Sequence, residues 1–192
     1  MDTSSDYLSL VLTSHGGILS SLRLLAGRRM SEELLCQIDN LVVSNGINIQ
    51  MIGEFYAVTG PGSFTGVRIG TAMAMGLAEG MSKPCYGFSS LDAAAISSGL
   101  TVCKAASKLK GDIFAVREYD FNRNEFSDYF CKTIDQNSLS EYVIVNSGSG
   151  TCLFLEKAVS DGRYDIFRSE CSPLYLRKSE AELNLDKKRL CS

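Results

Sequence analysis

Residues 60–70 read Gly-Pro-Gly-Ser-Phe-Thr-Gly-Val-Arg-Ile-Gly, and they are the most informative stretch of this 192-residue chain. The stretch follows a short apolar segment, residues 55–58, that is typical of a strand. It opens a segment rich in Ala, Met and Gly that predicts a helix over about residues 65–79. A strand, a glycine-rich loop and a helix in this order place backbone N–H groups and the positive end of a helix at one point. The loop is therefore a candidate phosphate site, with the residues Gly60, Gly62, Ser63, Thr65 and Gly66.

The spacing of these glycines does not match the two common phosphate-binding motifs. A Walker loop requires Gly-x-x-x-x-Gly-Lys-Ser/Thr, whereas Gly66 is followed by Val67 and Arg68, so the lysine is missing. The dinucleotide motif requires Gly-x-Gly-x-x-Gly, and Gly60, Gly62 and Gly66 miss that spacing by one residue. Alternatively, the glycines allow a helix to approach its neighbour closely and the loop to adopt a positive φ. Spacing alone leaves both interpretations open.

The composition excludes several classes of protein. Hydrophobic residues make up 45% of the chain and charged residues 21%, which is typical of a folded globular protein. The net charge of -3 makes the chain a poor candidate for binding a nucleic-acid backbone by itself. No apolar run approaches the roughly 18 residues that span a bilayer, and residues 1–6 are polar and acidic, unlike a signal peptide. We therefore expect a cytoplasmic protein without membrane contact.

Candidate catalytic residues are few. The seven cysteines are scattered singly and form no Cys-x-x-Cys pair, so neither a disulfide framework nor a metal centre is indicated. The single histidine, His15, stands beside Gly16-Gly17 in a predicted turn, where an exposed side chain is expected. A hydrolase nucleophile requires a base within reach, and neither Ser63 nor Thr65 has an evident one.

The order of predicted elements indicates an α/β fold with mixed sheets flanked by helices. Residues 7–14 and 18–25 predict a hairpin, and a helix follows from Ser31 to about Asn45. After the strand at 55–58 and the helix at 65–79, residues 85–88 predict a strand, and Ser89 begins a third helix.

The second half repeats this theme without visible sequence identity. The predicted elements are strands at 102–106 and 142–145, a hairpin from 112–119 and 125–134, and a helix near 153–159. Residues 147–150, Ser-Gly-Ser-Gly, are either a second anion-binding nest or a simple turn. We place a boundary near Gly99, which gives an N-terminal subdomain at 1–99 and a smaller α/β subdomain at 100–192 whose tail can pack back on the first.

The motif at residues 60–70 closely resembles the signature of the bacterial TsaB (YeaZ) family, and the resemblance continues on both sides. Asp2-Thr3-Ser4 resembles the opening DTS of that family, and residues 29–35 resemble its HSE-x-LL helix start. Residues 88–93 resemble its VSSL-x-A segment, and residues 173–177 resemble its terminal P-x-YLR. These stretches occur in family order along the whole chain.

The resemblance implies a duplicated actin/Hsp70-like (ASKHA, RNase H-like) fold with two subdomains. The family acts in forming N6-threonylcarbamoyladenosine in tRNA, where its members are regarded as non-catalytic partners of TsaD and associate with the ATPase TsaE. An older label called them M22 peptidases. The resemblance therefore implies no cofactor of the chain's own, with ATP and metal on partner subunits and tRNA contacted only through the complex.

Pairing in this family, with a second copy or with TsaD, uses the first two helices. The chain has small and apolar residues at helical spacing there, although the same face could pack inside its own domain. The resemblance favours a partner interface formed by Leu34, Leu35, Ile38, Phe64, Val67, Arg68, Ile69 and Met73. It also leaves Asp2 and Thr3 as a vestigial nucleotide site.

Three departures from the family pattern limit this assignment. Met1 stands directly before Asp2, where the family has several strand residues, so we expect either an upstream start or a rearranged sheet with unpaired backbone groups. Met30 replaces the histidine of HSE, and residues 105–107 read Ala-Ala-Ser where the family often has Asp-Ala-Arg. The rival functions are an ATP-dependent kinase or transferase that uses Asp2, Thr3 and the glycine loop, and a peptidase that uses Ser63.

Overall fold

The chain begins with an antiparallel hairpin that packs against a helix. The computed structural model describes residues 1–14, 17–145 and 166–176, and its first strands are β1 (Tyr7–Ser14) and β2 (Gly17–Leu25), as predicted. A short 3-10 turn, η1 (Gly27–Arg29), leads into α1 (Met30–Ser44), and η2 (Ile49–Met51) follows. The apolar face of α1 is buried against β1, because Leu34 and Ile38 pack with Leu8 and Leu10.

A parallel strand pair with its crossover helix carries the glycine loop. Strand β3 (Phe55–Val58) pairs in parallel with β4 (Cys85–Phe88), and α2 (Phe64–Gly80) connects them. These bounds agree with the predicted ones to within one residue. The helix begins after Ser63, whose side chain accepts a hydrogen bond from the Gly66 N–H and so caps the first turn.

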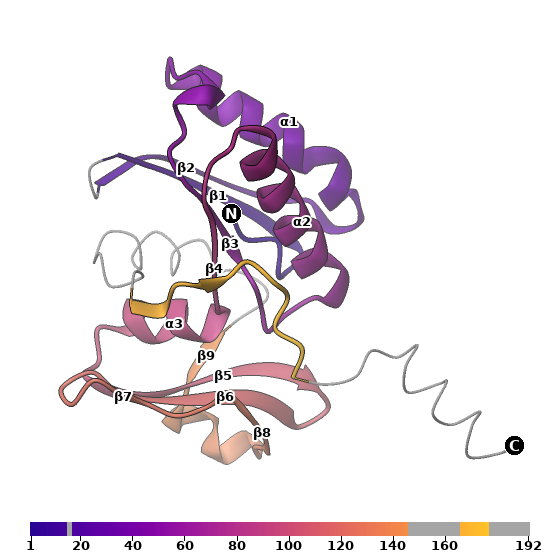
Figure 1. Ribbon diagram of the computed structural model, residues 1–192. Coiled ribbons are helices and arrows are strands. Elements are labelled where there is room, and N and C mark those ends of the chain that lie inside the picture. Colours follow the sequence, from indigo (N-terminus) through magenta and orange to yellow (C-terminus); the bar gives the residue numbers. More distant parts are fainter. Residues whose placement is uncertain (15–16, 146–165, 177–192) are drawn as a thin grey trace, which may run out of the picture.

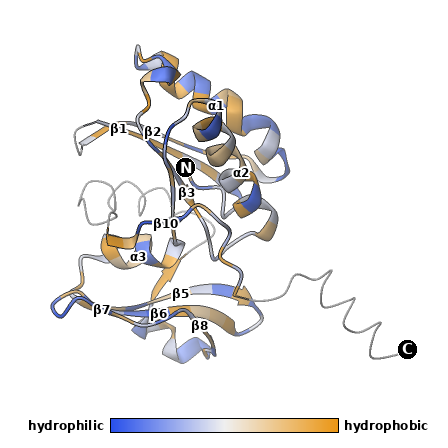
Figure 2. Ribbon diagram, viewed as in Figure 1, coloured by the Kyte–Doolittle hydropathy of each residue, from blue (hydrophilic) through white to orange (hydrophobic). Residues whose placement is uncertain are grey.

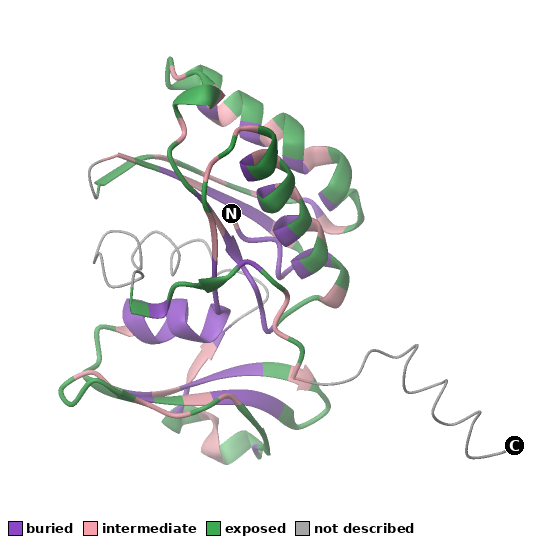
Figure 3. Ribbon diagram, in the orientation of Figure 1, coloured by how far each residue is buried: buried purple, intermediate pink, exposed green. Residues whose placement is uncertain are grey.

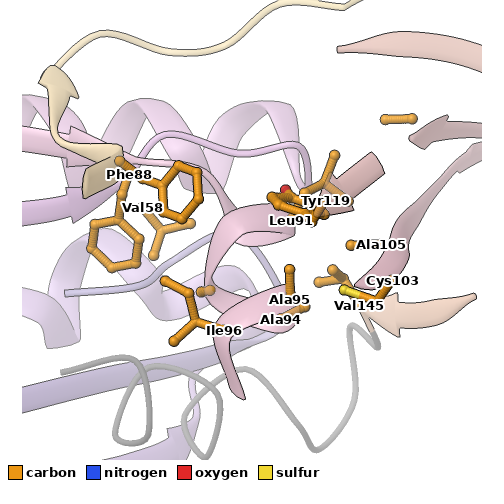
Figure 4. Close-up of a cluster of buried hydrophobic side chains, with 13 residues drawn as sticks. Val58, Phe88, Leu91, Ala94, Ala95, Ile96, Cys103, Ala105, Tyr119 and Val145 are labelled. Carbon is orange, nitrogen blue, oxygen red and sulfur yellow. The ribbon is translucent and has the colours of Figure 1, made fainter. Parts of the chain in front are cut away.

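Helix α3 (Ser90–Ser98) lies between the two halves of the molecule (Figure 1). Almost all of its side chains are buried, so it is purple along its length in Figure 3. Its residues Leu91 and Ile96 belong to one apolar cluster with Val58 and Phe88 of the first half and Ala105 and Val145 of the second (Figure 4). The largest core of the protein is therefore shared between the halves.

Within the described residues, the second half contains a five-stranded sheet. Strands β5 (Val102–Lys110) and β6 (Ile113–Asp120) form an antiparallel hairpin around Gly111, and β6 also pairs with β7 (Glu125–Phe126) and β8 (Phe130–Thr133). After η3 (Gln136–Glu141), β9 (Val143–Val145) runs parallel to β5. The predicted strand at 102–106 was too short, and the predicted strand at 125–134 is interrupted between β7 and β8. Both errors concern where pairing stops, which depends on the partner strand and not on the local sequence.

Residues 166–176 return to the first half of the molecule. Strand β10 (Ser169–Glu170) pairs antiparallel with β4, so the order of that sheet is β10-β4-β3. The Leu174 N–H then donates to the carbonyl of Thr59, just before the glycine loop. The end of the described chain is thus fixed next to the motif at residues 60–70.

The sheet of the first half is divided in two. Strands β1 and β2 form one sheet and β10, β4 and β3 another, and within the described residues no strand lies between β1 and β3. In the part of the chain that the structure describes, backbone hydrogen bonds of Met1 and Asp2 connect the two sheets. Asp2 exchanges two backbone hydrogen bonds with Ser9 of β1, at 2.8 and 2.9 Å, and Met1 bonds to Tyr56 and Val58 of β3 at 2.7 and 3.0 Å.

Helices α1 and α2 lie side by side on one outer face of the first half (Figure 1). Figure 2 shows mixed hydrophobic and hydrophilic residues along both helices. No helix within 1–14, 17–145 and 166–176 is long and apolar enough to cross a membrane. His15, the Ser-Gly-Ser-Gly segment at 147–150 and the helix predicted near 153–159 lie outside the described residues.

Candidate functional site: the glycine loop and the first two helices

The first residues of the chain pack against the glycine loop and the start of α2. The Thr3 hydroxyl donates to the carbonyl of Gly66 at 2.7 Å, and the Ser63 N–H donates to the carbonyl of Ser4 at 2.6 Å. On the other side of the loop, the Ser90 hydroxyl of α3 donates to the carbonyl of Pro61 at 2.7 Å. The two motifs DTS and GPGSFTG therefore form one structural unit.

The glycines of the motif are required by this close approach. A Cβ added at Gly62 would overlap the backbone of Ser4, and one added at Gly66 would overlap the backbone carbonyl of Thr3. A Cβ at Gly70 would overlap the Thr3 side chain. Gly60 adopts a φ of 99°, a conformation that favours glycine. The loop is glycine-rich because another segment of the chain lies against it.

We expect Gly66→Ala to destabilise the protein by about 1–3 kcal/mol, because the new methyl group meets a backbone atom that cannot rotate away. Gly76 of the same helix is a matched control, since its added Cβ would meet no atom within 4 Å. Gly76→Ala should stabilise the protein by about 0.5–1 kcal/mol through helix propensity. Urea unfolding of both variants measures the difference, and equal effects at the two sites would contradict this role of Gly66.

Several groups that a phosphate would use already have partners in the chain. The Ser63 N–H is bonded to Ser4, the Gly66 N–H to the Ser63 hydroxyl, and the Val67 N–H to the Ser63 carbonyl. The Ser63 oxygen is also occupied as the helix cap. This arrangement does not favour Ser63 as a nucleophile, and the described residues contain no group of three or more His, Cys, Asp and Glu side chains that could hold a metal.

Asp2 and Thr3, which the family resemblance suggested as a vestigial nucleotide site, are enclosed by the fold. Both are buried, and the Thr3 hydroxyl is bonded to Gly66. One oxygen of Asp2 accepts from the Ser4 N–H at 2.7 Å, whereas Oδ2 has no hydrogen-bond partner among the described residues. Burial raises the pKa of Asp2 above its usual range, although its hydrogen bonds to Ser4 act in the opposite direction.

The raised pKa of Asp2 predicts a pH dependence of stability. Because the folded state binds the Asp2 proton more tightly than the unfolded state, this carboxyl favours folding below about pH 4 and opposes it as the pH rises towards the folded pKa. Asp2→Asn should therefore unfold like the parent protein near pH 3 and be more stable by about 1–3 kcal/mol at pH 7. Thermal unfolding at several pH values tests this, and a variant that is less stable at pH 7 would show that the charged carboxylate is favourable.

The predicted interface residues lie at three different depths. Leu34, Ile38 and Val67 are buried within the chain itself. Ile69 and Met73 are half-buried and pack against the α1–β1 core, and Phe64 is also half-buried. Leu35 and Arg68 are exposed. A partner would thus meet Leu35 and Arg68 directly, whereas the three buried side chains would support the surface from below.

Arg68 connects the glycine motif to the end of the described chain. Its Nε donates to the Tyr175 hydroxyl at 2.7 Å, and its guanidinium lies 3.9 Å from the ring centre of Phe64. The rings of Phe64 and Tyr175 are 5.2 Å apart. The sequence analysis missed this contact, although the segment Pro-Leu-Tyr-Leu-Arg at 173–177 had been recognised as part of the same family pattern.

A groove of about 730 Å³ separates the starts of α1 and α2. It is lined by Ser5 and Asp6, by Leu25 to Met30, and by Ser63, Thr65, Gly66 and Ile69. Arg28 and Arg29 are exposed there, so one wall of the groove is cationic. Thr65, the remaining loop candidate, is exposed on the opposite wall.

A buried polar cluster holds α3 against the second sheet, and the sequence analysis did not find it. Asp92 caps α3 together with Ser89 and accepts hydrogen bonds from Arg117 at 2.7 Å and from the hydroxyls of Tyr119 and Tyr129 at 2.8 Å each. Burial raises the pKa of both tyrosines, and the Asp92 charge raises it further. Burial, the largest single influence, lowers the pKa of Arg117, but Asp92, Tyr129 and Tyr119 together outweigh it, so that pKa is raised. Asp92 is thus the shared hydrogen-bond acceptor of Arg117, Tyr119 and Tyr129.

Comparison with known proteins agrees with this architecture. A family model described as TsaD, tRNA N6-adenosine threonylcarbamoyltransferase, matches residues 8–139. Two solved structures, YeaZ from Pseudomonas aeruginosa and a second protein from that organism described as similar to peptidase YeaZ, align with TM-scores of 0.69 and 0.71 at 20% identity. The alignments cover 91% and 92% of this chain and 97% of each structure. The mixed sheets, the flanking helices and the glycine loop thus define an α/β protein of the actin-like class.

Two curated relatives specify the family further. Both are named tRNA threonylcarbamoyladenosine biosynthesis protein TsaB; the Haemophilus influenzae protein is 30% identical over 142 residues and the Escherichia coli protein 33% identical over 91 residues. These matches cover 74% and 47% of this chain, and 56% and 39% of the relatives, so the chain spans about half the length of the curated relatives it matches. The chain belongs to the family of the matched model, in its TsaB (YeaZ) branch.

Proposed function

We propose that this chain is a non-catalytic subunit of the complex that forms N6-threonylcarbamoyladenosine in tRNA. In this proposal it pairs through α1 and α2 with a TsaD-like subunit, which carries the catalytic site together with ATP and metal. A TsaE-like ATPase is the further partner, and tRNA contacts the chain only through the complex. When the catalytic subunit is absent, two copies of this chain form a homodimer through the same helices in this proposal.

One observation carries the proposal: the outer side of α1 and α2 combines exposed and half-buried apolar residues above a fixed core. Leu35 is 51% exposed, and Ile69 and Met73 reach the surface of α2 from the α1–β1 core. An aromatic and arginine group, Phe64 with Arg68, lies at the start of the same helix. Aromatic residues, Met and Arg are enriched in protein interfaces.

The chemistry of the glycine loop supports a scaffold more than an enzyme. Its glycines receive the backbone of residues 3 and 4, several of its N–H groups are bonded within the chain, and the hydroxyl of Ser63 caps a helix. The enclosed Asp2 and Thr3 support the same conclusion. The names of the curated relatives support a role in this tRNA modification pathway. The proposal that α1 and α2 form the pairing surface rests on the apolar residues on the outer side of these helices.

Co-expression of the chain with a tagged TsaD-like subunit tests the proposal. We expect the two proteins to elute together in size-exclusion chromatography as a complex of defined stoichiometry. The isolated chain should show no tight binding of ATP–Mg²⁺ in calorimetry. Tight nucleotide binding without a partner would instead favour the kinase or transferase alternative, and labelling of Ser63 by a serine-hydrolase probe would favour the peptidase.

A further inference from the structure

Two cysteines that lie far apart in the sequence meet where the chain returns to the first half. Cys85 is the first residue of β4, and Cys171 directly follows β10. Because β10 pairs with β4, the returning segment (residues 166–176, the last coloured part of the chain in Figure 1) carries Cys171 to the strand that begins with Cys85. Both cysteines are free thiols, and they pack in the same apolar cluster.

The backbone of the returning segment crosses the face of β4 on which the Cys85 side chain stands. Successive side chains of a strand point to opposite faces, so positions 85 and 87 share a face. A Cβ added at Gly87 would lie 2.6 Å from the carbonyl oxygen of Glu170 and 3.2 Å from the Cα of Cys171. The absence of a side chain at Gly87 therefore allows Cys171 to lie over the same face as Cys85.

The two thiols are hydrogen-bond partners of each other. Cys171 is buried, whereas Cys85 is half-buried and reaches the solvent. Two sulfurs that are already in contact need only a small shift to reach the S–S distance of about 2.05 Å. The pair therefore has one thiol that a small oxidant can reach and a second thiol directly behind it.

We propose that Cys85 and Cys171 form a modification site, at which hydrogen peroxide converts the two thiols into an intramolecular disulfide. The Cys85 thiolate attacks one oxygen of the peroxide and becomes a sulfenic acid, while the O–O bond breaks and the hydroxide that leaves takes up the proton released by Cys85. The Cys171 sulfur then attacks the Cys85 sulfur and forms the S–S bond, and the displaced oxygen leaves as water with the proton of Cys171. The two thiols lose two electrons in total, and the peroxide is reduced to two waters.

The buried setting makes the reaction slow and its product durable. Burial raises the pKa of Cys85, and burial together with the neighbouring Cys85 thiol raises the pKa of Cys171 to about 12. Because the thiolate is the attacking form, little of the pair reacts during a short exposure at neutral pH. The same high pKa makes each sulfur a poor leaving group, so reductants open the bond slowly. The site therefore responds to sustained exposure to peroxide.

The disulfide fixes the returning segment to β4 by a covalent bond. In this segment the Leu174 N–H donates to the carbonyl of Thr59, and the Tyr175 hydroxyl accepts from Arg68 of the glycine motif. The bond also closes a long loop that contains the second sheet, and closing a long loop lowers the entropy of the unfolded chain. Oxidation thus stabilises the fold and holds Tyr175 at the start of α2. The proposal does not depend on the function proposed above.

The test exposes the purified chain to hydrogen peroxide, alkylates the remaining thiols after unfolding and maps the peptides by mass spectrometry. We expect a bond between Cys85 and Cys171, with alkylation of each falling at least about tenfold and returning after treatment with dithiothreitol. The melting temperature should be higher by at least about 5 °C in the oxidised sample than in the same sample after reduction. Peptides without this bond after prolonged exposure, or with either cysteine joined to a different one, would overturn the proposal. An unchanged melting temperature with the bond formed would overturn the stabilising role.

Two variants and an internal control test the order of the steps. In Cys171→Ser the sulfenic acid of Cys85 has no second thiol to react with, so it should persist and be labelled by dimedone. In Cys85→Ser the buried Cys171 should not be labelled, and labelling there would overturn the assigned order. Cys103 is the internal control, because burial raises its pKa too but its thiol is bonded to Ser98 and not to a cysteine. It should remain available for alkylation after the peroxide treatment.

Discussion

Ile69→Asp and Met73→Asp should each abolish co-purification with a TsaD-like subunit. Both residues are half-buried on α2, where a bound partner would remove the remaining water from the new carboxylate. An unpaired charge in an apolar interface costs several kcal/mol, and about 3 kcal/mol corresponds to a loss of affinity of more than about 100-fold. Size-exclusion chromatography and a quantitative pull-down measure the loss.

Met75→Asp is the matched control for Met73→Asp. It makes the same change on the same helix, two residues further along, where the side chain is 50% exposed and points away from the α1–α2 contact. This variant should retain the complex. Because Ile69 and Met73 also contact the core of the chain, Leu35→Asp on the exposed side of α1 separates binding from folding. Normal complex formation by Leu35→Asp and Ile69→Asp, each with a parent-like melting curve, would refute the proposed interface.

Asp92→Ala should lower the free energy of unfolding by about 3–5 kcal/mol. The substitution leaves the partly buried Arg117 guanidinium and the hydroxyls of Tyr119 and Tyr129 without their shared acceptor, and it removes half of the capping box of α3. For a protein of this size, the melting temperature should fall by on the order of 10 °C. Urea unfolding and thermal melts measure both quantities.

A surface ion pair that involves β6, the strand of Arg117, serves as the control for Asp92→Ala. Glu118 follows Arg117 in the sequence and lies 3.6 Å from Lys104, and both of these side chains are about half exposed. Glu118→Ala should change the free energy of unfolding by no more than about 1 kcal/mol, because exposed ion pairs contribute little. If Asp92→Ala were as mild as Glu118→Ala, the buried cluster would not be what holds α3 to the second sheet.

The elements of the first half were predictable because their signals are local. The alternation in residues 7–14, the apolar segments at 55–58 and 85–88, and the Ser89-x-x-Asp92 capping box each specify a strand or a helix start without reference to the rest of the chain. Strand β10 had no such signal. It has two residues, and it is a strand only because β4 offers an edge to it.

The sequence could not predict which of the interface residues are buried within the chain and which are exposed. Helical periodicity identifies an apolar face, but it does not distinguish a face that meets the chain's own core from one that meets a partner. Leu34 and Ile38 proved to face β1, whereas Leu35 faces solvent. The glycines did indicate a close neighbour, since Gly66 and Gly70 are one helical turn apart, but only the structure identifies that neighbour as Thr3.

The return of residues 166–176 to β4 has a consequence for synthesis of the protein on the ribosome. The glycine loop and β4 emerge early, but β10, which covers the edge of β4, and Tyr175, which contacts Arg68, are translated only after β5 to β9. Until then the nascent chain carries an uncovered sheet edge, which is a hazard for aggregation. A message truncated shortly after codon 145 should therefore yield an aggregating product and not a smaller folded one.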